Sequence, residues 1–403
     1  MTFELHGNIL LAIIPLLALI YIIARTKVSR LSTTSWHSLP GYYAWHAIIC
    51  ATLPAIIIGT FFSILHLFDL YHASASLYVP FVTVMVLVGA VYGLNSIAPS
   101  LKARDSVERF IRWLLVTAAM ISILTTVGIV LSVIFEATHF FKMVSFWDFV
   151  TGTSWTPDDA TPGNTKGMFG SVPIFAGTFM VTLIAMLVAV PIGLLSAIYT
   201  AEYSSNRVRN IAKPALEVLA GIPTVVYGFF AAVTISPMVV HFAESMGIAA
   251  DYTNILTPGL VMGIMIIPFI SSLSDDVIRS IPQNMRDGSL ALGTTVSETI
   301  RHILLPAALP GIVAAFLLGV SRALGETMIV VMAAGLRPNL TWNPLEGMTT
   351  VTVRIVDALT GDQSFDSPET LSAFGLGLVL LIITLMLNIV SIYVVRRFRQ
   401  QYE

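Results

Sequence analysis

The amino-acid sequence predicts an all-α integral membrane protein. Hydrophobic residues make up 56% of the 403 residues, whereas charged residues make up only 11%; an ordinary soluble domain carries about 25% charged residues. The mean hydropathy is +0.85, and the apolar residues form runs long enough to cross a bilayer as helices. The formal net charge of −2 offers no basic surface for nucleic acid. The composition therefore predicts a lipid bilayer as the environment of the chain.

Nine apolar segments are expected to cross the membrane. They lie near residues 8–24, 44–67, 77–98, 111–136, 173–201, 214–242, 256–274, 307–336 and 373–395. No basic residue precedes the first segment, and Arg25, Lys27 and Arg30 follow it directly. A secretory signal peptide has the opposite charge order, so we expect the first segment to be retained as a membrane helix.

The basic residues indicate the orientation of the chain. With an outer N-terminus and nine crossings, 16 of the 21 Lys and Arg residues fall in inner loops and the C-terminal tail, and four fall in outer loops. The remaining one, Arg322, lies inside a segment. Because cytoplasmic loops of membrane proteins carry an excess of Lys and Arg, the sequence predicts an outer N-terminus and a cytoplasmic C-terminus.

Two of the predicted outer loops are long, at about residues 137–172 and 337–372. Loops of that length are often functional, and a solvated lid without a partner is the alternative. Within the second loop, Met348–Leu359 has the composition of a short surface helix or a short strand. Its periodicity does not decide between the two.

Two opposite charges, Arg322 and Glu326, lie in the otherwise uncharged run Leu309–Gly335. A charge at that depth is costly, and it usually faces the interior of a bundle or a water-filled path. The spacing of four residues would place both groups on one helix face, close enough to pair. Two interpretations stay open: a structural ion pair, or the polar lining of a translocation path that includes the neighbouring Ser321 and Thr327.

The inner loop between the seventh and eighth segments has the features of a docking site for a cytoplasmic partner. Pro282 begins this loop as a helix breaker, and a short helix with Leu290 and Leu292 among its apolar residues is expected after it. Gly293 allows a turn or a close approach of another surface. Pro306 suits the first turn of the next membrane helix.

The sequence lacks the common catalytic motifs. None of the five lysines follows a glycine, so there is no Gly-Lys pair of a phosphate-binding P-loop. A His-Glu-x-x-His zinc motif and a Gly-x-Ser-x-Gly elbow are also absent, and a single cysteine, Cys50, excludes an intrachain disulfide. Asp275 and Asp276, at the inner end of the seventh segment, are assigned to the membrane surface or the inner loop. We therefore expect no catalytic residue, and no metal or cofactor bound by this chain.

The inner loop resembles the Glu-Ala-Ala (EAA) signature of ATP-binding-cassette (ABC) importer permeases. Gly293, Ile303, Leu305 and Pro306 match the signature in register, whereas Asp287, Gly288 and Ser289 stand for its Glu-Ala-Ala start. The acid is kept, but Gly and Ser have lower helix propensity than Ala. The resemblance implies that these seven residues dock a cytoplasmic ATPase.

Further motifs resemble the phosphate-specific members of these permeases. Ser321–Met328 looks like their membrane signature, and Ile329–Gly335, Phe146–Pro157 and Pro214–Gly228 look more like the PstC subunit than its partner PstA. The resemblance implies a type I ABC importer permease fold, with a MetI-like six-helix core, over residues 105–403. Residues 1–104 would form an N-terminal extension with three membrane helices, either a stabilising flank or a binding site for a regulator or lipid. Packing or gating roles are implied for Gly221, Pro223 and Tyr227.

The resemblance further implies the permease subunit of an ATP-driven, high-affinity importer of inorganic phosphate that works by alternating access. The chain would lie in the cell membrane beside a PstA-type permease. Its other partners would be a PstB-type ATPase dimer, which uses the ATP, and a periplasmic or extracellular phosphate-binding protein. Arg322 is expected to meet the anion, since a guanidinium suits phosphate oxygens. Glu326 would hold Arg322 while the path is empty.

Three other functions stay open. A permease for another oxyanion, such as sulfate or molybdate, would share the docking loop but is not expected to share the Ser321–Met328 run. An ion-coupled secondary carrier would show inverted halves with interrupted helices, and the spacing of the docking loop argues against it. A sensor or scaffold that transports nothing would use the charged pair only structurally.

Overall fold

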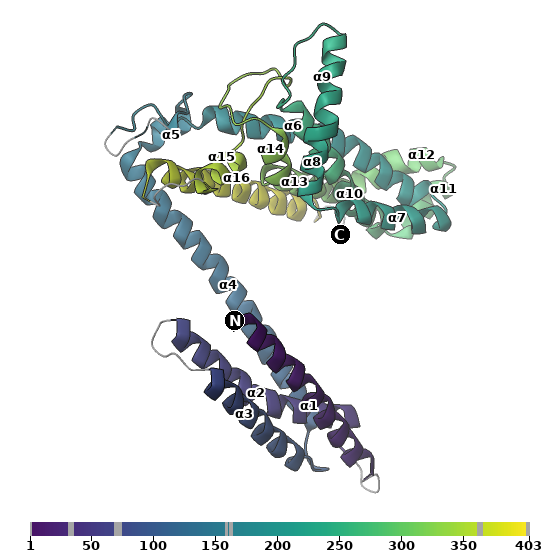
Figure 1. The fold of residues 1–403 in the computed structure, drawn as a ribbon. Helices are drawn as coiled ribbons and strands as arrows, with labels where there is room; N and C mark the ends of the chain where they lie inside the picture. Colours follow the sequence, from purple (N-terminus) through teal and green to yellow (C-terminus); the bar gives the residue numbers. More distant parts are fainter. Residues whose placement is uncertain are drawn as a thin grey trace. The chain divides into compact units, whose positions relative to one another are not determined.

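The computed structural model describes residues 2–30, 36–67, 75–157, 160, 164–360 and 366–399. Within these residues the chain is mainly helical, and its β-structure is limited to isolated bridges. The chain divides into two compact units, residues 1–128 and 129–403 (Figure 1). The division falls inside one long helix, α4 (Ala103–Met143). The domain boundary predicted between residues 104 and 105 falls at the start of α4 and stays a prediction.

The first unit contains α1 (Thr2–Arg30), α2 (Pro40–Leu67), α3 (Ala75–Asn95) and the beginning of α4. Two glycines of α3, Gly89 and Gly93, face α2, and a side chain at Gly89 would overlap the carbonyl oxygen of Cys50. Small residues at such positions let the backbones of membrane helices approach closely. The Gly89-x-x-x-Gly93 spacing therefore explains the tight packing of α2 on α3.

A buried histidine of α2 links three parts of the first unit. The two ring nitrogens of His46 lie 3.2 Å from the hydroxyl of Ser96 and 3.1 Å from that of Ser106. Ser96 donates its own proton to the carbonyl oxygen of Gly93, so the ring nitrogen facing Ser96 is the donor in that contact. His46 therefore holds the start of α4 against the α2–α3 pair.

The second unit contains the end of α4 and all later elements. These are α5 (Phe146–Thr151), α6 (Val172–Ile198), η2 (Tyr199–Tyr203), α7 (Asn206–Ala220), α8 (Thr224–Phe230), η3 (Ala231–Ile235), α9 (Ser236–Ser245), α10 (Leu256–Ser280), α11 (Gln283–Ala291), α12 (Val296–Thr299), η4 (Ile300–Leu304), α13 (Leu305–Leu324), α14 (Met328–Ala333), α15 (Val351–Thr360) and α16 (Pro368–Arg399). The three η elements are π-helical turns. The main core lies between α6 and α10, where Ala185, Met262 and Ile266 are fully buried. Gly259 and Gly263 of α10 face α6 and allow the close packing of these two helices.

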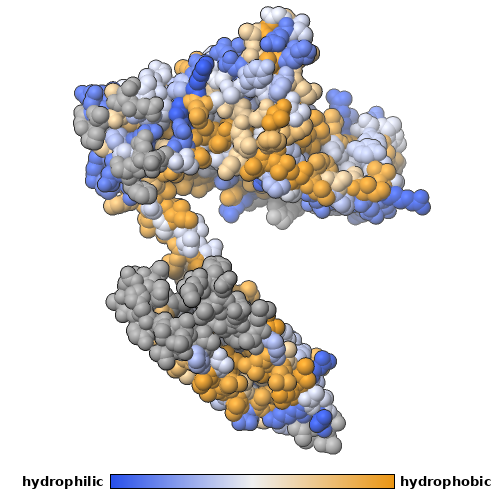
Figure 2. Space-filling model, viewed as in Figure 1, coloured by the Kyte–Doolittle hydropathy of each residue, from blue (hydrophilic) through white to orange (hydrophobic). Residues whose placement is uncertain are grey.

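Seven helical stretches of the described chain are long and apolar enough to cross a membrane. They are Pro40–Phe62, Ala103–Met143, Val172–Tyr203, Thr224–Ser245, Leu256–Ser280, Val296–Leu324 and Pro368–Arg397. The other two predicted segments, 8–24 and 77–98, overlap α1 and α3. On α6, Leu183 and Leu187 are 57% and 66% exposed, and Figure 2 shows apolar residues over much of the drawn surface. Such a surface suits contact with lipid, and the predicted all-α multi-pass membrane fold is confirmed.

The predicted segment 214–242 has the wrong start. Residues 206–220 form a separate amphipathic helix, α7, which has no buried residue, and the membrane stretch begins at Thr224. The break lies at Gly221–Pro223, because a residue before proline, here Ile222, is disfavoured in the helical conformation. α7 carries Arg207, Arg209 and Lys213, which explains why it is not a membrane span.

The predicted segment 307–336 is also interrupted. Its helical stretch begins earlier, at Val296, and ends at Leu324, and residues 328–333 form the short helix α14. Pro306 does lie in the first turn of α13, as predicted. The π turn η4 directly precedes this turn; a proline within a helix removes one backbone donor and crowds the preceding turn.

Both long loops that are predicted to lie outside pack on other parts of the second unit. In the first loop Trp155 is buried with Phe149 and Phe169, and its ring meets that of Phe169 edge to face at 5.6 Å. In the second loop the undecided segment Met348–Leu359 forms a helix, α15, from Val351 onward. The backbone N–H of Val351 donates to the hydroxyl of Thr178 on α6 at 2.9 Å. The described parts of both loops are therefore packed on the helices, and a partner for either loop stays a prediction.

Candidate functional site

Arg322 lies in the last turn of α13 and is exposed. Its guanidinium carbon lies 6.0 Å from the centre of the Phe269 ring on α10, a distance at which a cation is attracted to an aromatic face. Within the described residues it forms no ion pair at 4.0 Å or less. A guanidinium in a membrane stretch without a carboxylate partner is free to bind an anion.

The predicted pairing of Arg322 with Glu326 is wrong. α13 ends at Leu324 and Gly325 is its C-cap, so the two side chains do not share a helix face. Oε1 of Glu326 instead accepts hydrogen bonds from the backbone N–H groups of Thr327 and Met328, at 3.1 and 3.2 Å. A carboxylate stabilises the start of a helix in this way. Glu326 therefore caps α14 rather than neutralising Arg322.

The two neighbouring polar residues of the predicted path have separate contacts. The hydroxyl of Ser321 donates to Oδ1 of Asn388 on α16 at 3.2 Å. The hydroxyl of Thr327 lies 3.4 Å from the carbonyl oxygen of Gly325, inside the break between α13 and α14. The four predicted path residues thus lie around the end of α13, but only Arg322 lines the cavity described next.

A cavity of about 290 Å³ lies between α7, α10 and the end of α13. Its lining contains three cationic side chains and two carboxylates. The lining residues are Thr200, Arg209, Lys213, Leu216, Glu217, Ala220, Met265, Pro268, Phe269, Ser271, Ser272, Asp275 and Arg322. With one positive charge in excess and several hydroxyls, the cavity suits a small anion.

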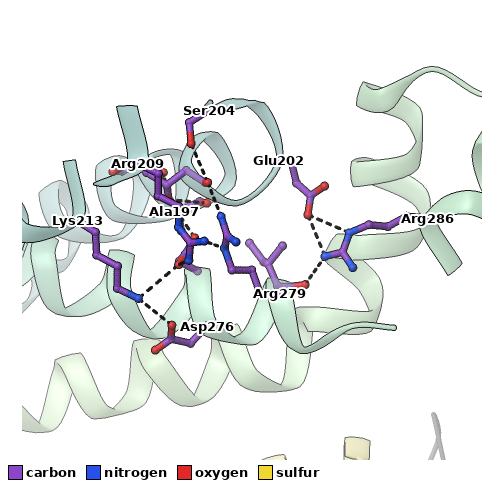
Figure 3. A network of polar contacts seen from close by, with 12 residues as sticks. Ala197, Glu202, Ser204, Arg209, Lys213, Asp276, Arg279 and Arg286 are labelled. Atoms are coloured by element: carbon purple, nitrogen blue, oxygen red, sulfur yellow. Dashed lines mark hydrogen bonds and ion pairs between the residues drawn. The ribbon is translucent and has the colours of Figure 1, made fainter. Parts of the chain in front are cut away.

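Asp275 is the buried centre of an ion-pair network near the C-terminal end of α10. Its side chain is 5% exposed, and it lies 3.1 Å from Arg209, 3.1 Å from Arg279 and 3.7 Å from Lys213. Lys213 also contacts Asp276 at 3.1 Å (Figure 3). A buried carboxylate needs such partners because its desolvation is costly. Asp275 is thus paired within the protein, whereas Asp276 is 60% exposed; the assignment of both residues to the membrane surface or the inner loop stays a prediction.

The predicted docking loop forms two short helices joined by a left-handed turn. Pro282 is the N-cap of α11, and Gly293 has a φ of +86°, which favours glycine. Leu290 and Leu292 are 45% and 87% exposed, although Leu292 is the C-cap of α11 and not part of it. Exposed leucines beside a rigid turn offer an apolar surface to a partner.

The seven predicted docking residues divide into a surface group and an internal group. Asp287, Gly288, Gly293 and Pro306 are exposed, Ile303 and Leu305 pack on a buried cluster around Ile300 and Leu304, and Ser289 is buried. The hydroxyl of Ser289 lies 2.6 Å from that of Thr294 and 2.9 Å from that of Thr299. These hydroxyls hold α11 against α12, so Ser289 shapes the loop instead of presenting its side chain.

The three predicted packing or gating residues surround the break between α7 and α8. Gly221 is the C-cap of α7 and Pro223 is the N-cap of α8. The hydroxyl of Tyr227 donates to the carbonyl oxygen of Leu219 at 2.9 Å and so spans the break. Their place in the fold is that of a connection, and a gating role stays a prediction.

Sequence reasoning missed the contribution of Arg209, Lys213 and Asp275 to one site. The available signal was a pair of spacings: Arg209 and Lys213 lie four residues apart on α7, as do Asp275 and Arg279 on α10. When Arg209 and Lys213 are treated only as charges of a predicted inner loop, this spacing is overlooked.

Two family models match this chain. The model for the inner membrane component of binding-protein-dependent transport systems matches residues 189–402. A model described as a phosphate ATP-binding cassette transporter matches residues 10–68, within the N-terminal extension.

Individual relatives agree with these matches. The probable ABC transporter permease protein YqgH of Bacillus subtilis is 33% identical over 288 residues, which cover 71% of this chain and 90% of the relative. The phosphate transport system permease protein PstC 1 of Mycobacterium tuberculosis is 32% identical over 320 residues, covering 71% of this chain and 92% of the relative.

A solved structure supports the fold alone. It is the crystal structure of a bacterial alginate ABC transporter in complex with an alginate pentasaccharide-bound periplasmic protein. Its TM-score is 0.50 at 16% identity, and the match covers 73% of this chain and 96% of that chain. The helical fold and the family matches together define a membrane permease subunit of an ABC importer. Within that class, the chain belongs to the PstC-type permease family.

Proposed function

We propose that this chain is one of two permease subunits of an ATP-driven importer of inorganic phosphate. The family membership and the PstC relatives support the substrate class. The observation that carries the proposal in the structure is the cavity with its unpaired guanidinium, Arg322. A charge kept in a membrane stretch needs a function or a partner, and Arg322 has no carboxylate partner within the described chain.

Arg322 is proposed to contact the transported anion. A guanidinium presents a planar set of donors that matches two oxygens of a phosphate at once. Its position over Phe269 leaves it exposed toward the cavity, and the aromatic ring partly balances the charge when the cavity is empty. Glu326 keeps α14 in place, so it supports the shape of the path instead of holding Arg322.

The 283–306 loop is proposed to couple this chain to ATP-driven movement of the ATPase. Its exposed Leu290 and Leu292 would contact a PstB-type ATPase dimer on the cytoplasmic side. With this loop inside, the N-terminus is outside, the C-terminus is cytoplasmic and the two long loops face the phosphate-binding protein. ATP-driven movement of the loop would alternate the access of the path, which this chain would share with a PstA-type permease. This chain would bind neither ATP nor another cofactor.

Reconstituted transport tests this function. The complete complex is placed in proteoliposomes with ATP inside and the phosphate-binding protein outside, and uptake of radiolabelled phosphate is measured. ATP-dependent uptake that is not reduced by excess sulfate or molybdate supports a phosphate importer. Uptake driven by an ion gradient without ATP would support a secondary carrier, and preferred uptake of sulfate or molybdate would identify a different oxyanion as the substrate.

A further inference from the structure

The cavity beside Arg322 extends along α10 to a pair of further cations, Arg209 and Lys213. Its lining residues on α10 run from Met265 to Asp275, which corresponds to ~15 Å along the helix axis. Arg322 contacts Phe269, whereas Arg209 and Lys213 contact Asp275. Phe269 and Asp275 are six residues apart in the sequence, or roughly 9 Å along the helix. One cavity is therefore lined by Arg322 at one height along α10 and by Arg209 and Lys213 at another.

The two oxygens of Asp275 have different partners. Oδ1 accepts from Nε of Arg279 at 3.1 Å and from the hydroxyl of Thr200 at 3.2 Å. Oδ2 lies 3.1 Å from Nη2 of Arg209 and 3.7 Å from Nζ of Lys213. Thus α10 and η2 hold one carboxylate oxygen, and the other oxygen occupies the two cations of α7.

We propose that Arg209 and Lys213 form a second anion-binding site whose ligand is an oxyanion of the phosphate class. Oδ2 of Asp275 occupies this site while the cavity is empty. The inference rests on the proposed function, because it assumes that an oxyanion passes Arg322. An anion that moves from Arg322 toward Asp275 replaces Oδ2 as the partner of Arg209 and Lys213.

The exchange leaves no buried charge without a partner. After Oδ2 is displaced, Asp275 keeps Arg279 and Thr200 through Oδ1. Lys213 keeps Asp276, which lies 3.1 Å away. Losing one member of a buried ion pair is otherwise strongly unfavourable. The remaining contacts therefore make the replacement of Oδ2 by an anion physically feasible.

Competition by Asp275 also sets how firmly the anion is held. A transport site must bind its ion well enough to admit it and weakly enough to release it. Oδ2 opposes tight binding because every release of the anion restores its contacts with Arg209 and Lys213. The site therefore binds the anion transiently and allows it to leave.

Equilibrium binding of phosphate to the purified complete complex, without binding protein or ATP, tests this site. Asp275→Asn removes the competing charge, so we expect phosphate affinity to rise about tenfold, with slower uptake in proteoliposomes. Lys213→Gln removes one ligand and should lower the affinity about tenfold. Arg207→Gln is the matched control, since Arg207 lies on the same helix but does not line the cavity, and it should leave the phosphate affinity unchanged.

Unchanged or weaker phosphate binding by an assembled Asp275→Asn complex would overturn the proposal. If that variant fails to assemble, Lys213→Gln decides, and an affinity equal to that of the Arg207→Gln control would overturn it. A wild-type complex that imports another oxyanion in place of phosphate contradicts the proposed function alone. Binding of that oxyanion by the same variants is then measured in place of phosphate binding, so failure of the proposed function is distinguished from failure of the second site.

Discussion

Arg286 of α11 and Glu202 of η2 form an ion pair with 3.0 Å between Nη2 and Oε1, and their side chains are only 13% and 12% exposed. The same guanidinium donates to the carbonyl oxygens of Ile278 and Ile281 at the end of α10. The predicted docking loop is thereby attached to the helices that form the core, as Figure 3 shows for Arg286 and Glu202. A movement of α11 is expected to reach both α6 and α10.

Replacing Arg286 should weaken this attachment. Arg286→Gln leaves Glu202 without its partner, and we expect the free energy of unfolding to fall by about 3 kcal/mol, together with less phosphate uptake per ATP hydrolysed. The ratio of uptake to hydrolysis in proteoliposomes is the measurement, and Arg301→Gln, an exposed change of the same charge in the same loop, is the control. A ratio equal to that of the control would show that the ion pair does not transmit the movement.

The turn at Gly293 should be sensitive to a side chain. Its φ of +86° is unfavourable for a branched residue, so Gly293→Val should cost about 1–3 kcal/mol and reduce binding of the ATPase or its coupling to uptake. Gly288→Ala is the contrasting variant, because an added methyl there meets no atom within 4 Å and should stabilise α11 by about 1 kcal/mol. Normal coupled hydrolysis in Gly293→Val would argue against this loop as the docking element.

The orientation of the chain can be tested by cysteine labelling. Cys50 is first replaced by Ser, and single cysteines are then placed at Asn206, at the start of α7, and at Asn164, in the first long loop. Both positions are exposed. The basic residues predict that only the first is labelled from the cytoplasmic side and only the second from outside. The reverse pattern would contradict every loop assignment.

The packing of the N-terminal extension should depend on Gly89. A side chain there overlaps the backbone of α2, so Gly89→Leu should separate α2 from α3 and lower the melting temperature of the complex. Gly128→Ala serves as the control, since its added methyl meets no atom within 4 Å. Equal melting temperatures for Gly89→Leu and the control would show that the α2–α3 contact contributes little to stability.

The sequence predicted the helices and the loop better than it predicted contacts. Hydropathy located the seven described stretches that are long and apolar enough to cross a membrane, because lipid burial requires long apolar runs, but it misplaced the start of one and missed the break in another. Pro282, Gly293 and Pro306 correctly marked a helix start, a turn and a second helix start, because proline fixes the local backbone and glycine permits a positive φ. The predicted pairing of Arg322 with Glu326 was wrong because hydropathy does not reveal that the helix ends at Gly325 within an apolar run. The network around Asp275 depends on α7 lying beside α10, which no local pattern specifies.

The separation of Arg322 from Glu326 predicts independent effects in a double-mutant cycle. Arg322→Gln should not destabilise the protein through Glu326, which keeps its backbone donors. Glu326→Gln should weaken the cap of α14 by about 1 kcal/mol. Melting temperatures of the two single variants and the double variant measure the coupling, and we expect the two effects to add. A large coupling energy would indicate that the two charges pair in another state of the protein.

ATP-dependent uptake of radiolabelled phosphate by Arg322→Gln tests the central claim most directly. Complexes assembled to equal amounts are compared with wild type and with Arg337→Gln, a loss of one exposed basic residue in the loop after α14. If Arg322 contacts the anion in the path, its loss should reduce the initial rate of uptake at least about tenfold, while Arg337→Gln transports normally. An Arg322→Gln complex that imports phosphate at the wild-type rate would contradict the account.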